Sequence, residues 1–306
     1  MNQNQLKYFV AAAENRSFTK AAEQFYISQT AITQQIRLLE QTLGCALFDR
    51  STRPVALTEA GEIFLSEARA ILERMNRAVE MTHGAAIGMS GSLKIGYVCG
   101  YERSDLSVWM QRFHRAHPDI LVSFYRCSTD VLSAGVLSGA YDLVFTWDST
   151  NLKQNPEAAY RTVEQVRLVV ALYQGHPLAK RESLLRQELL GENILYMSPS
   201  ADMESYGDAF YMELYRQAGF KPNILFRSSD AESILMMVAS EEGISILPDY
   251  CTTKLYHADN LCFVPLTGEK EVEEIVAVWR GDNRNPALSL CVKALEGLTP
   301  RRNTGK

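Results

Sequence analysis

Residues 17–44 read SFTKAAEQFYISQTAITQQIRLLEQTLG, and this stretch predicts two helices joined by a tight turn. In the first helix, Ala21, Ala22 and Phe25 recur at the spacing of one helix face. Ser28 follows the turn and is a favourable N-cap for the second helix. The apolar positions of the second helix are Ala31, Ile32, Ile36, Leu39 and Leu43. Its other side is polar, so the stretch is typical of a helix-turn-helix motif.

The segments on either side of this motif extend it into a small domain. Residues 5–15 carry an apolar stripe at helical spacing, which predicts a preceding helix. Residues 47–57 place two short apolar pieces around a polar tip, as in a β-hairpin wing. Residues 59–82 contain no proline and carry a heptad-like apolar seam. We therefore expect an all-α winged helix-turn-helix followed by a long linker helix that dimerises.

A run of small residues over 84–92 is the clearest domain boundary in the chain. Beyond it, predicted strands and helices alternate, including a strand over 166–173 and a helix over 180–190. This alternation predicts an α/β region of two small lobes with a mainly parallel sheet. The expected parts are a DNA-binding domain over 1–58, a linker and dimerisation helix over 59–83, a hinge over 84–92, one effector lobe over 93–162 and 267–300, and a second lobe over 163–266.

Composition narrows the classes of protein that this chain can belong to. Hydrophobic residues make up 46% of the 306 positions, which excludes a mainly disordered chain. The net charge is −5, yet residues 1–58 carry six basic and four acidic side chains. A mildly basic N-terminal segment followed by an acidic remainder is compatible with a small DNA-binding module. No apolar stretch approaches a membrane span, the first residues do not resemble a signal peptide, and the six scattered cysteines are typical of reduced thiols, so we expect a cytoplasmic protein.

Several stretches match one family of regulators in register. They are LKYFV at 6–10, SFTKAA at 17–22, SQTAITQQI at 28–36, LFDR at 47–50 and LTEAG at 57–61. The chain resembles the LysR-type transcriptional regulators, and HPLA at 176–179 and GISILP at 243–248 are similar to phrases of their effector region. The resemblance implies a winged helix-turn-helix, a linker helix and a two-lobed effector domain of periplasmic-binding-protein type. It also implies a sequence-specific transcriptional regulator controlled by a small molecule between the lobes.

The same resemblance implies partners: double-stranded DNA with an imperfect palindromic operator, a homodimer or a tetramer built as a dimer of dimers, and RNA polymerase. The effector is expected to be a carboxylate or an aromatic compound. Two other classes stay open from the sequence. One is a two-lobed solute-binding protein without a regulatory role, and the other is an α/β enzyme. No nucleophile elbow, zinc-protease motif or phosphate-binding loop supports catalysis, and we expect no cofactor.

The expected base-reading residues lie at the start of the second helix, where a recognition helix enters the major groove. They are Gln29, Thr30, Thr33 and Gln34. Glutamine can pair with adenine, and a threonine methyl can contact that of thymine. Phosphate contacts are expected from Lys20 and Arg37. Arg50 and Arg53 flank the wing, from which they are expected to reach phosphates or the minor groove. Thr30 and Gln34 stand where the family often has proline and arginine. The alternative is that this face is only a solvated helix surface.

The expected effector-binding residues lie at predicted strand ends and helix starts, where α/β lobes bind ligands. They are Cys99, Gly100, Tyr101, Ser128, Thr129, Trp147, Ser198, Ser229 and Asp230. Helix N-termini would suit an anionic effector, whereas the nearby Tyr125 and Tyr196, together with Tyr101 and Trp147, favour a bulkier or aromatic one. The alternative is that these serines and aspartates only cap the helices that follow them.

Two further residue pairs have alternative interpretations. Cys99 and Cys127 end consecutive predicted strands, so they could form a redox pair if they lie close together. The alternative is a pair of half-buried thiols without redox chemistry. His114 and His117 lack a companion cysteine or carboxylate cluster, so no metal site is expected.

Overall fold

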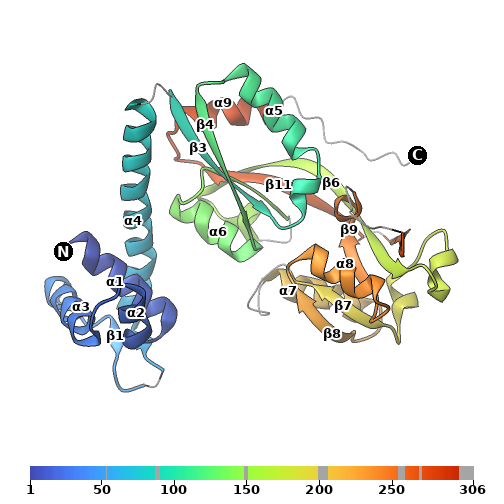
Figure 1. The fold of residues 1–306 in the computed structure, drawn as a ribbon, viewed down its shortest axis with the longest axis horizontal. Coiled ribbons are helices and arrows are strands. Elements are labelled where there is room, and N and C mark those ends of the chain that lie inside the picture. Colours follow the sequence, from blue (N-terminus) through green and yellow to red (C-terminus); the bar gives the residue numbers. More distant parts are fainter. Residues whose placement is uncertain are drawn as a thin grey trace. The chain divides into compact units, whose positions relative to one another are not determined.

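The computed structural model describes residues 1–52, 54–86, 90–147, 151–198, 206–253, 259–268 and 271–295. It contains two compact units, one of Met1–Ala86 with Ser138–Ala140 and one of Ile87–Leu137 with Tyr141–Lys306. Figure 1 labels most of the helices and strands of both units. No helix in the described ranges combines the length and the apolar character that crossing a membrane requires.

Three helices form the body of the first unit: α1 Gln3–Asn15, α2 Phe18–Gln24 and α3 Gln29–Leu43. A side chain caps the N-terminus of each of these helices, as the predicted helix boundaries require. Ser17 accepts a hydrogen bond from the backbone of Lys20 at 3.3 Å, and Ser28 accepts one from Ala31 at 3.1 Å. Gly44 ends α3 with a φ of 73°, a left-handed conformation that glycine adopts without steric cost. The expected helix-turn-helix is present.

The wing and the long helix complete the first unit. Strands β1 Phe48–Asp49 and β2 Ala56–Leu57 pair antiparallel. Helix α4 then spans Glu59–Ala86. At Gly61, a Cβ atom would lie 2.1 Å from the carbonyl oxygen of Leu47, so only glycine lets α4 pack this closely on the wing. The core that joins these elements consists of Leu6, Phe9, Ala11, Ala12, Ala21, Ala22, Ile32, Ile36, Leu39, Leu47, Phe48 and Ala68.

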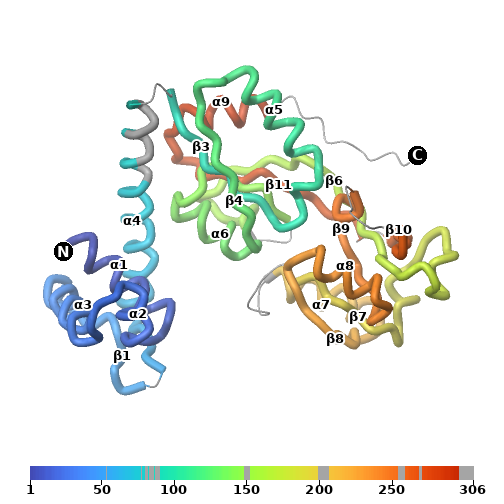
Figure 2. Tube along the Cα trace, viewed as in Figure 1, coloured from blue at the N-terminus to red at the C-terminus, as the bar shows by residue number. Residues whose placement is uncertain are grey.

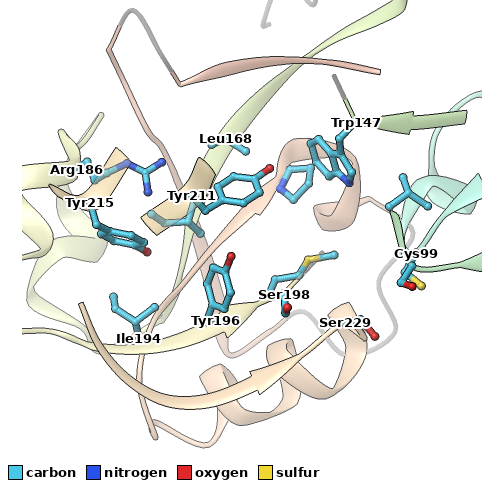
Figure 3. A pocket seen from close by; sticks show the side chains of 15 residues that line it. Cys99, Trp147, Leu168, Arg186, Ile194, Tyr196, Ser198, Tyr211, Tyr215 and Ser229 are labelled. Atoms are coloured by element: carbon cyan, nitrogen blue, oxygen red, sulfur yellow. The ribbon is translucent and has the colours of Figure 1, made fainter. Parts of the chain in front are cut away.

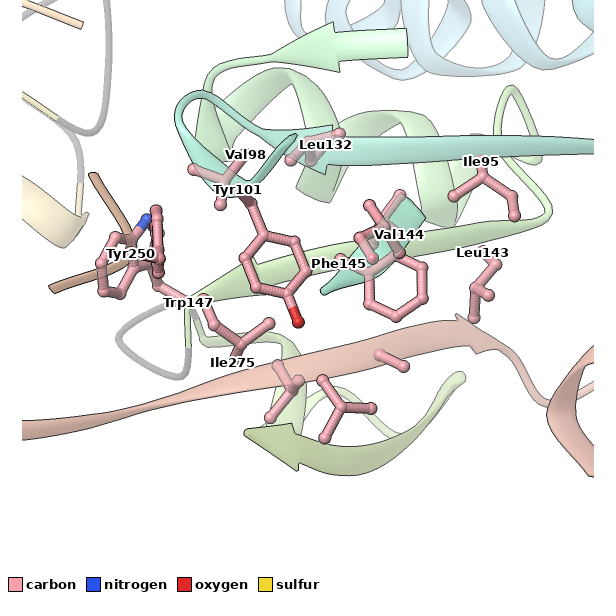
Figure 4. Close-up of a cluster of buried hydrophobic side chains, with 14 of the residues drawn as sticks. Ile95, Val98, Tyr101, Leu132, Leu143, Val144, Phe145, Trp147, Tyr250 and Ile275 are labelled. Atoms are coloured by element: carbon pink, nitrogen blue, oxygen red, sulfur yellow. The ribbon is translucent and has the colours of Figure 1, made fainter. Parts of the chain in front are cut away.

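The first lobe of the second unit is a sheet covered by helices on both faces. Its strands β3 Gly91–Val98, β4 Ile120–Cys127 and β5 Leu143–Trp147 are parallel, with β3 in the middle. The helices are α5 Leu106–Ala116, α6 Thr129–Ser138 and α9 Pro286–Leu295. Figures 1 and 2 show α5 and α9 on one side of this sheet and α6 on the other. Figure 4 shows the buried cluster, in which Tyr101 lies between Phe145 and Tyr250, with ring centroids 5.9 and 5.4 Å away.

Two long strands connect the lobes. Strand β6 spans Ala158–Tyr173, and β11 spans Val272–Arg280. The first half of β6 pairs with β11, and its second half pairs with β9 Ser245–Pro248 and β10 Leu261–Pro265. All these pairings, and that of β11 with β5, are antiparallel. The prediction of a mainly parallel sheet was therefore wrong, because the crossing strands run against the strands that they join.

The second lobe adds β7 Asn193–Met197, β8 Asn223–Ser228, α7 Tyr206–Gln217 and α8 Ala231–Ala239. Strands β7 and β8 are parallel, and a bridge between Ile194 and Ile244 attaches them next to β9. The helix expected over 180–190 is absent: the structure has two short 3₁₀ turns, Pro177–Lys180 and Arg186–Leu189. The backbone of Leu184, between the turns, instead donates a hydrogen bond to Pro265 on β10 at 2.9 Å.

Candidate DNA-binding surface and effector pocket

Helix α3 has one buried face and one polar, exposed face. Ile32, Ile36 and Leu39 are fully buried against the core of the first unit. On the other side, the residues expected to contact DNA are exposed or, for Thr33, half-buried, and they are Gln29, Thr30, Thr33, Gln34 and Arg37. Near the start of the helix, Gln29 and Gln34 therefore present side-chain amides to solvent, and Thr30 presents a hydroxyl. Leu43, expected on the buried side, is instead exposed near the end of α3.

The turn before α3 carries an aromatic residue that sequence reasoning did not select. Tyr26 is 96% exposed, and its backbone is left-handed, with a φ of 55°. Non-glycine residues adopt this conformation rarely, and bulky ones more rarely than asparagine. An exposed aromatic ring two residues before the cap of α3 adjoins the polar face. The sequence does contain a signal that could have selected Tyr26, because an aromatic residue within a tight turn is unusual.

The basic residues around α3 have different surroundings. Lys20 on α2 is exposed. Arg50 at the end of the wing strand β1 is held by Glu40, whose carboxylate accepts its guanidinium at 2.9 Å. Glu40 also accepts the backbone N–H groups of Leu47 at 2.9 Å and Phe48 at 3.3 Å. Glu40 thus ties α3 to the wing. Arg53, the other wing residue expected to contact DNA, lies outside the described residues.

A pocket lies between the two lobes of the second unit, as Figure 3 shows from close by. Its lining residues are Val98, Cys99, Ser128, Trp147, Leu168, Arg186, Ile194, Tyr196, Met197, Ser198, Tyr211, Tyr215, Ser229, Ile246 and Pro248. The cavity has a volume of about 40 Å³, which is room for only a few waters. A larger ligand would have to displace side chains or separate the lobes.

Five of the nine residues expected to bind an effector line this pocket: Cys99, Ser128, Trp147, Ser198 and Ser229. They come from the ends of β3, β4, β5, β7 and β8, where the expectation placed them. Strand ends from both lobes therefore meet at one pocket. The hydroxyl of Ser198 donates to the Asp208 carboxylate at 2.9 Å.

The other four expected residues lie outside the pocket lining. Tyr101 packs in the core of the first lobe, and its hydroxyl donates to Glu164 at 3.2 Å. Burial, followed by the charge of Glu164, raises the pKa of the Tyr101 phenol. Gly100 has a φ of 92°, and a Cβ there would lie 2.8 Å from the sulfur of Cys251. Gly100 therefore serves a tight turn after β3.

Thr129 and Asp230 occupy helix starts. Thr129 is buried in the first turn of α6. Asp230 is the N-cap of α8, where its carboxylate accepts the backbone N–H of Ser233 at 3.0 Å. Hydrogen bonds from Ser233 and the positive charge of Arg126 outweigh the opposing effect of partial burial, so the pKa of Asp230 is lowered. For Asp230, the capping interpretation accounts for its hydrogen bonds.

Ion pairs join the lobes beside the pocket. The guanidinium of Arg126, at the end of β4, lies 3.3 Å from Glu102 in the first lobe and 3.7 Å from Asp230 in the second. Arg103 pairs with Glu232 on α8. Opposite charges therefore face each other across the two lobes. Sequence reasoning did not find these pairs, because no local pattern reveals which residues meet across the lobes.

The inner wall of the pocket was also missed. Arg186 stands on a 3₁₀ turn, and Tyr211 and Tyr215 stand on α7. Arg186 makes two hydrogen bonds to the Glu271 carboxylate, at 2.9 and 2.6 Å, and its guanidinium carbon lies 4.8 Å from the ring centroid of Tyr215. Burial raises the pKa of Tyr215 to about 12. The only sequence signal was the tyrosine spacing of one helical turn on α7, which equally fits an ordinary core.

Cys99 and Cys127 are close neighbours, and their sulfur atoms contact different oxygen atoms. The Cys99 sulfur lies 3.6 Å from the Cys127 carbonyl oxygen, and the Cys127 sulfur lies 3.2 Å from the Tyr141 hydroxyl. Both thiols are free. Burial is the main cause of the raised pKa of Cys99, which disfavours the reactive thiolate. These surroundings favour the interpretation without redox chemistry.

Comparisons with known proteins agree with both halves of the structure. The description "Bacterial regulatory helix-turn-helix protein, lysR family" matches residues 3–62, and "LysR substrate binding domain" matches residues 86–299. The chain is 31% identical to the HTH-type transcriptional regulator BenM of Acinetobacter baylyi, over 99% of this chain and 100% of that protein. It is 30% identical to the hydrogen peroxide-inducible genes activator of Dickeya chrysanthemi, over 92% of this chain and 90% of that protein.

Among solved structures, the crystal structure of CbnR, a LysR family transcriptional regulator, matches 97% of this chain and 98% of its own, with a TM-score of 0.69 and 25% identity. Full-length CbnR in complex with its target DNA matches with a TM-score of 0.68 and 26% identity, over 98% and 100% of the two chains. The helix-turn-helix, the two-lobed α/β unit and these matches lead to one conclusion: the chain belongs to the LysR family of DNA-binding transcriptional regulators with an effector-binding domain.

Proposed function

We propose that α3 reads base edges in the major groove through Gln29, Thr30, Thr33 and Gln34. The single observation that carries this proposal is the exposed polar face of a helix whose opposite face is fully buried. A recognition helix needs this division, because its side chains must reach the groove while its inner face anchors it. Lys20, Arg37 and the wing residue Arg53 supply phosphate contacts. Arg50 contributes mainly through Glu40, which positions the wing.

The effector binds in the pocket between the lobes, with Cys99, Ser128, Trp147, Ser198 and Ser229 in its lining. Binding changes the spacing of the lobes, because the pocket is too small for more than a few waters in this conformation. The linker helix α4 passes the change to the DNA-binding domains, which alters their tilt on the operator. One lobe spans residues 93–162 with 267–300, and the other spans 163–266. These limits are proposed because β6 and β11 cross between the two lobes.

Dimers form through α4. Four apolar residues of this helix are exposed in the single chain: Ile63, Ile71, Met75 and Val79. Apolar residues on a long helix are stabilised when a second helix covers them. Tetramers, contact with RNA polymerase and a cytoplasmic location complete the proposal. We also propose that the protein catalyses no reaction, because its relatives are transcriptional regulators.

The base-reading role is tested with Gln29→Ala in the full-length protein, using fluorescence anisotropy with the protein's own upstream promoter fragment and with random DNA. We expect operator affinity to fall about tenfold, since a bidentate base contact contributes about 1–3 kcal/mol of discrimination, and random-DNA affinity to stay unchanged. Gln41→Ala, an exposed change near the other end of α3, is the matched control. Equal losses on both DNAs would remove Gln29 from the base-reading set.

A further inference from the structure

The turn between α2 and α3 places an aromatic side chain beside the start of the proposed recognition helix. Helix α2 ends in a Schellman motif: the backbone N–H of Tyr26 donates to Glu23 at 3.1 Å, and that of Ile27 donates to Ala22 at 3.1 Å. This motif requires a left-handed residue directly after the C-cap, Phe25. Tyr26 fills that position, with its φ of 55°. A position that usually holds glycine therefore holds tyrosine.

The residues on either side of Tyr26 anchor the turn to the core. The Phe25 ring packs edge to face on Tyr8, with centroids 4.9 Å apart, and Ile27 packs against the same buried cluster. The Tyr26 side chain is exposed instead, and it makes no hydrogen bond or ring contact with the described residues. The ring of Tyr26 therefore extends into solvent from a turn that is fixed by its neighbours.

The left-handed backbone makes tyrosine an unfavourable residue at this position. Its Cβ atom crowds the backbone there, whereas glycine or asparagine tolerates the conformation better. Packing within the chain does not offset this strain, because a fully exposed ring buries almost no surface. Strained residues of this kind cluster at functional sites. A contact that the Tyr26 ring makes outside the folded chain would offset the strain.

The surface around Tyr26 is polar. The exposed residues nearest to it in the chain are Glu23, Gln24, Ser28, Gln29 and Thr30. The exposed apolar residues of α3, Leu38 and Leu43, lie in the later half of that helix. A surface that docks on another protein usually contains a contiguous apolar patch. A single tyrosine among amides and hydroxyls is more typical of a surface that contacts the sugar-phosphate backbone of DNA.

The position of Tyr26 relative to α3 favours the edge of the DNA groove. In a helix-turn-helix, the N-terminal residues of the recognition helix contact base edges, and the preceding helix crosses the DNA backbone. Tyr26 lies between these two helices, two residues before Ser28, the N-cap of α3. Because a sugar-phosphate strand borders the major groove on each side, a side chain at this place meets sugar and phosphate rather than base edges.

We infer that Tyr26 contacts the DNA backbone beside the major groove, where its ring packs against a deoxyribose and its hydroxyl donates a hydrogen bond to a phosphate oxygen. Tyrosine is one of the side chains that make such contacts. A hydrogen bond to a charged oxygen is also stronger than one between neutral groups. The contact positions α3 in the groove without reading the sequence. The inference rests on the proposed function, since it adds a residue to the same DNA-binding surface.

The test measures the affinity of the full-length protein for its own upstream promoter fragment and for random DNA by fluorescence anisotropy. Tyr26→Phe removes only the hydroxyl and keeps the backbone and the ring, so its result does not depend on a change in folding. We expect it to weaken binding to both DNAs by about 3- to 10-fold, the loss of one net hydrogen bond. Tyr26→Gly, which accepts the left-handed backbone, should weaken both by at least as much. Tyr160→Phe, an exposed tyrosine of the second unit, is the matched control and should change neither.

The salt dependence of binding separates this contact from a cationic one. A neutral hydroxyl releases no counterion, so both Tyr26 variants should keep the wild-type slope of log affinity against log salt concentration, whereas Lys20→Ala should make it shallower by about one. Wild-type affinity in either Tyr26 variant, a loss confined to the promoter fragment, or a shallower slope would overturn the inference. If the unmodified protein shows no preference for its promoter fragment, the proposed function fails instead, whatever the variants do.

Discussion

The buried ion pair between Arg186 and Glu271 should be the most costly polar contact to break in the effector-binding unit. The side chains are 4% and 9% exposed and share two short hydrogen bonds. Glu271→Gln keeps the shape but removes the negative charge, which leaves the Arg186 charge buried without a counter-charge. Breaking buried pairs in this way costs about 3–5 kcal/mol. We expect about 3 kcal/mol here, because the amide oxygen still accepts one hydrogen bond.

The assay is equilibrium unfolding in urea, followed by tryptophan fluorescence. Trp109, Trp147 and Trp279 are the only tryptophans in the chain, and all lie in the second unit, so the signal reports that unit. The matched control is Glu213→Gln, which removes a charge from an exposed pair: Arg216 and Glu213 are 74% and 41% exposed, with 2.5 Å between their atoms. Exposed pairs contribute about 0–1 kcal/mol. A loss in Glu271→Gln no larger than in the control would refute the reasoning.

Three other predictions concern backbone strain and thiol reactivity. Gly100→Ala should lower the free energy of unfolding by more than Gly191→Ala in the same urea titration, because both have a positive φ but only Gly100 lacks room for a Cβ; equal losses would contradict the packing account. Tyr26→Asn should stabilise the first unit by about 1 kcal/mol, measured by circular dichroism, and a loss of stability would show that the exposed ring makes a favourable contact. Cys99 should react with iodoacetamide at pH 8 more slowly than the exposed Cys45, since burial raises the Cys99 pKa; equal rates by mass spectrometry would contradict this.

The helix-turn-helix could be predicted because its information is local. The caps Ser17 and Ser28 and the apolar spacing of α3 lie within 28 consecutive residues, and the same residues cap and pack the helices in the structure. Local patterns also placed the ends of β3, β4 and β5, so several pocket residues were found. Periodicity and capping were sufficient to predict the role of a residue wherever that role depends on its immediate neighbours in sequence.

Features that depend on long-range pairing could not be predicted. Strand β6 begins at Ala158 rather than at Val166, because its first half has few consecutive apolar residues and is held by pairing with β11 about a hundred residues later. The partner of Arg186 is likewise 85 positions away, at Glu271. The meeting of Tyr196, Tyr211 and Tyr215 in the pocket lining depends on bringing α7 close to β7. Local sequence contains no signal for any of these contacts.

The most direct test of the central claim, that the first unit reads a specific DNA sequence through α3, is the affinity of the unmodified protein for its own upstream promoter fragment and for a shuffled fragment of equal length and composition. The measurement is made across a series of salt concentrations, because phosphate contacts alone give salt-dependent binding to any DNA. We predict at least a roughly hundredfold preference for the promoter fragment, a conservative value for specific DNA readers, and its loss when the polar face of α3 is replaced. Equal affinity for the two fragments at every salt concentration would contradict the account.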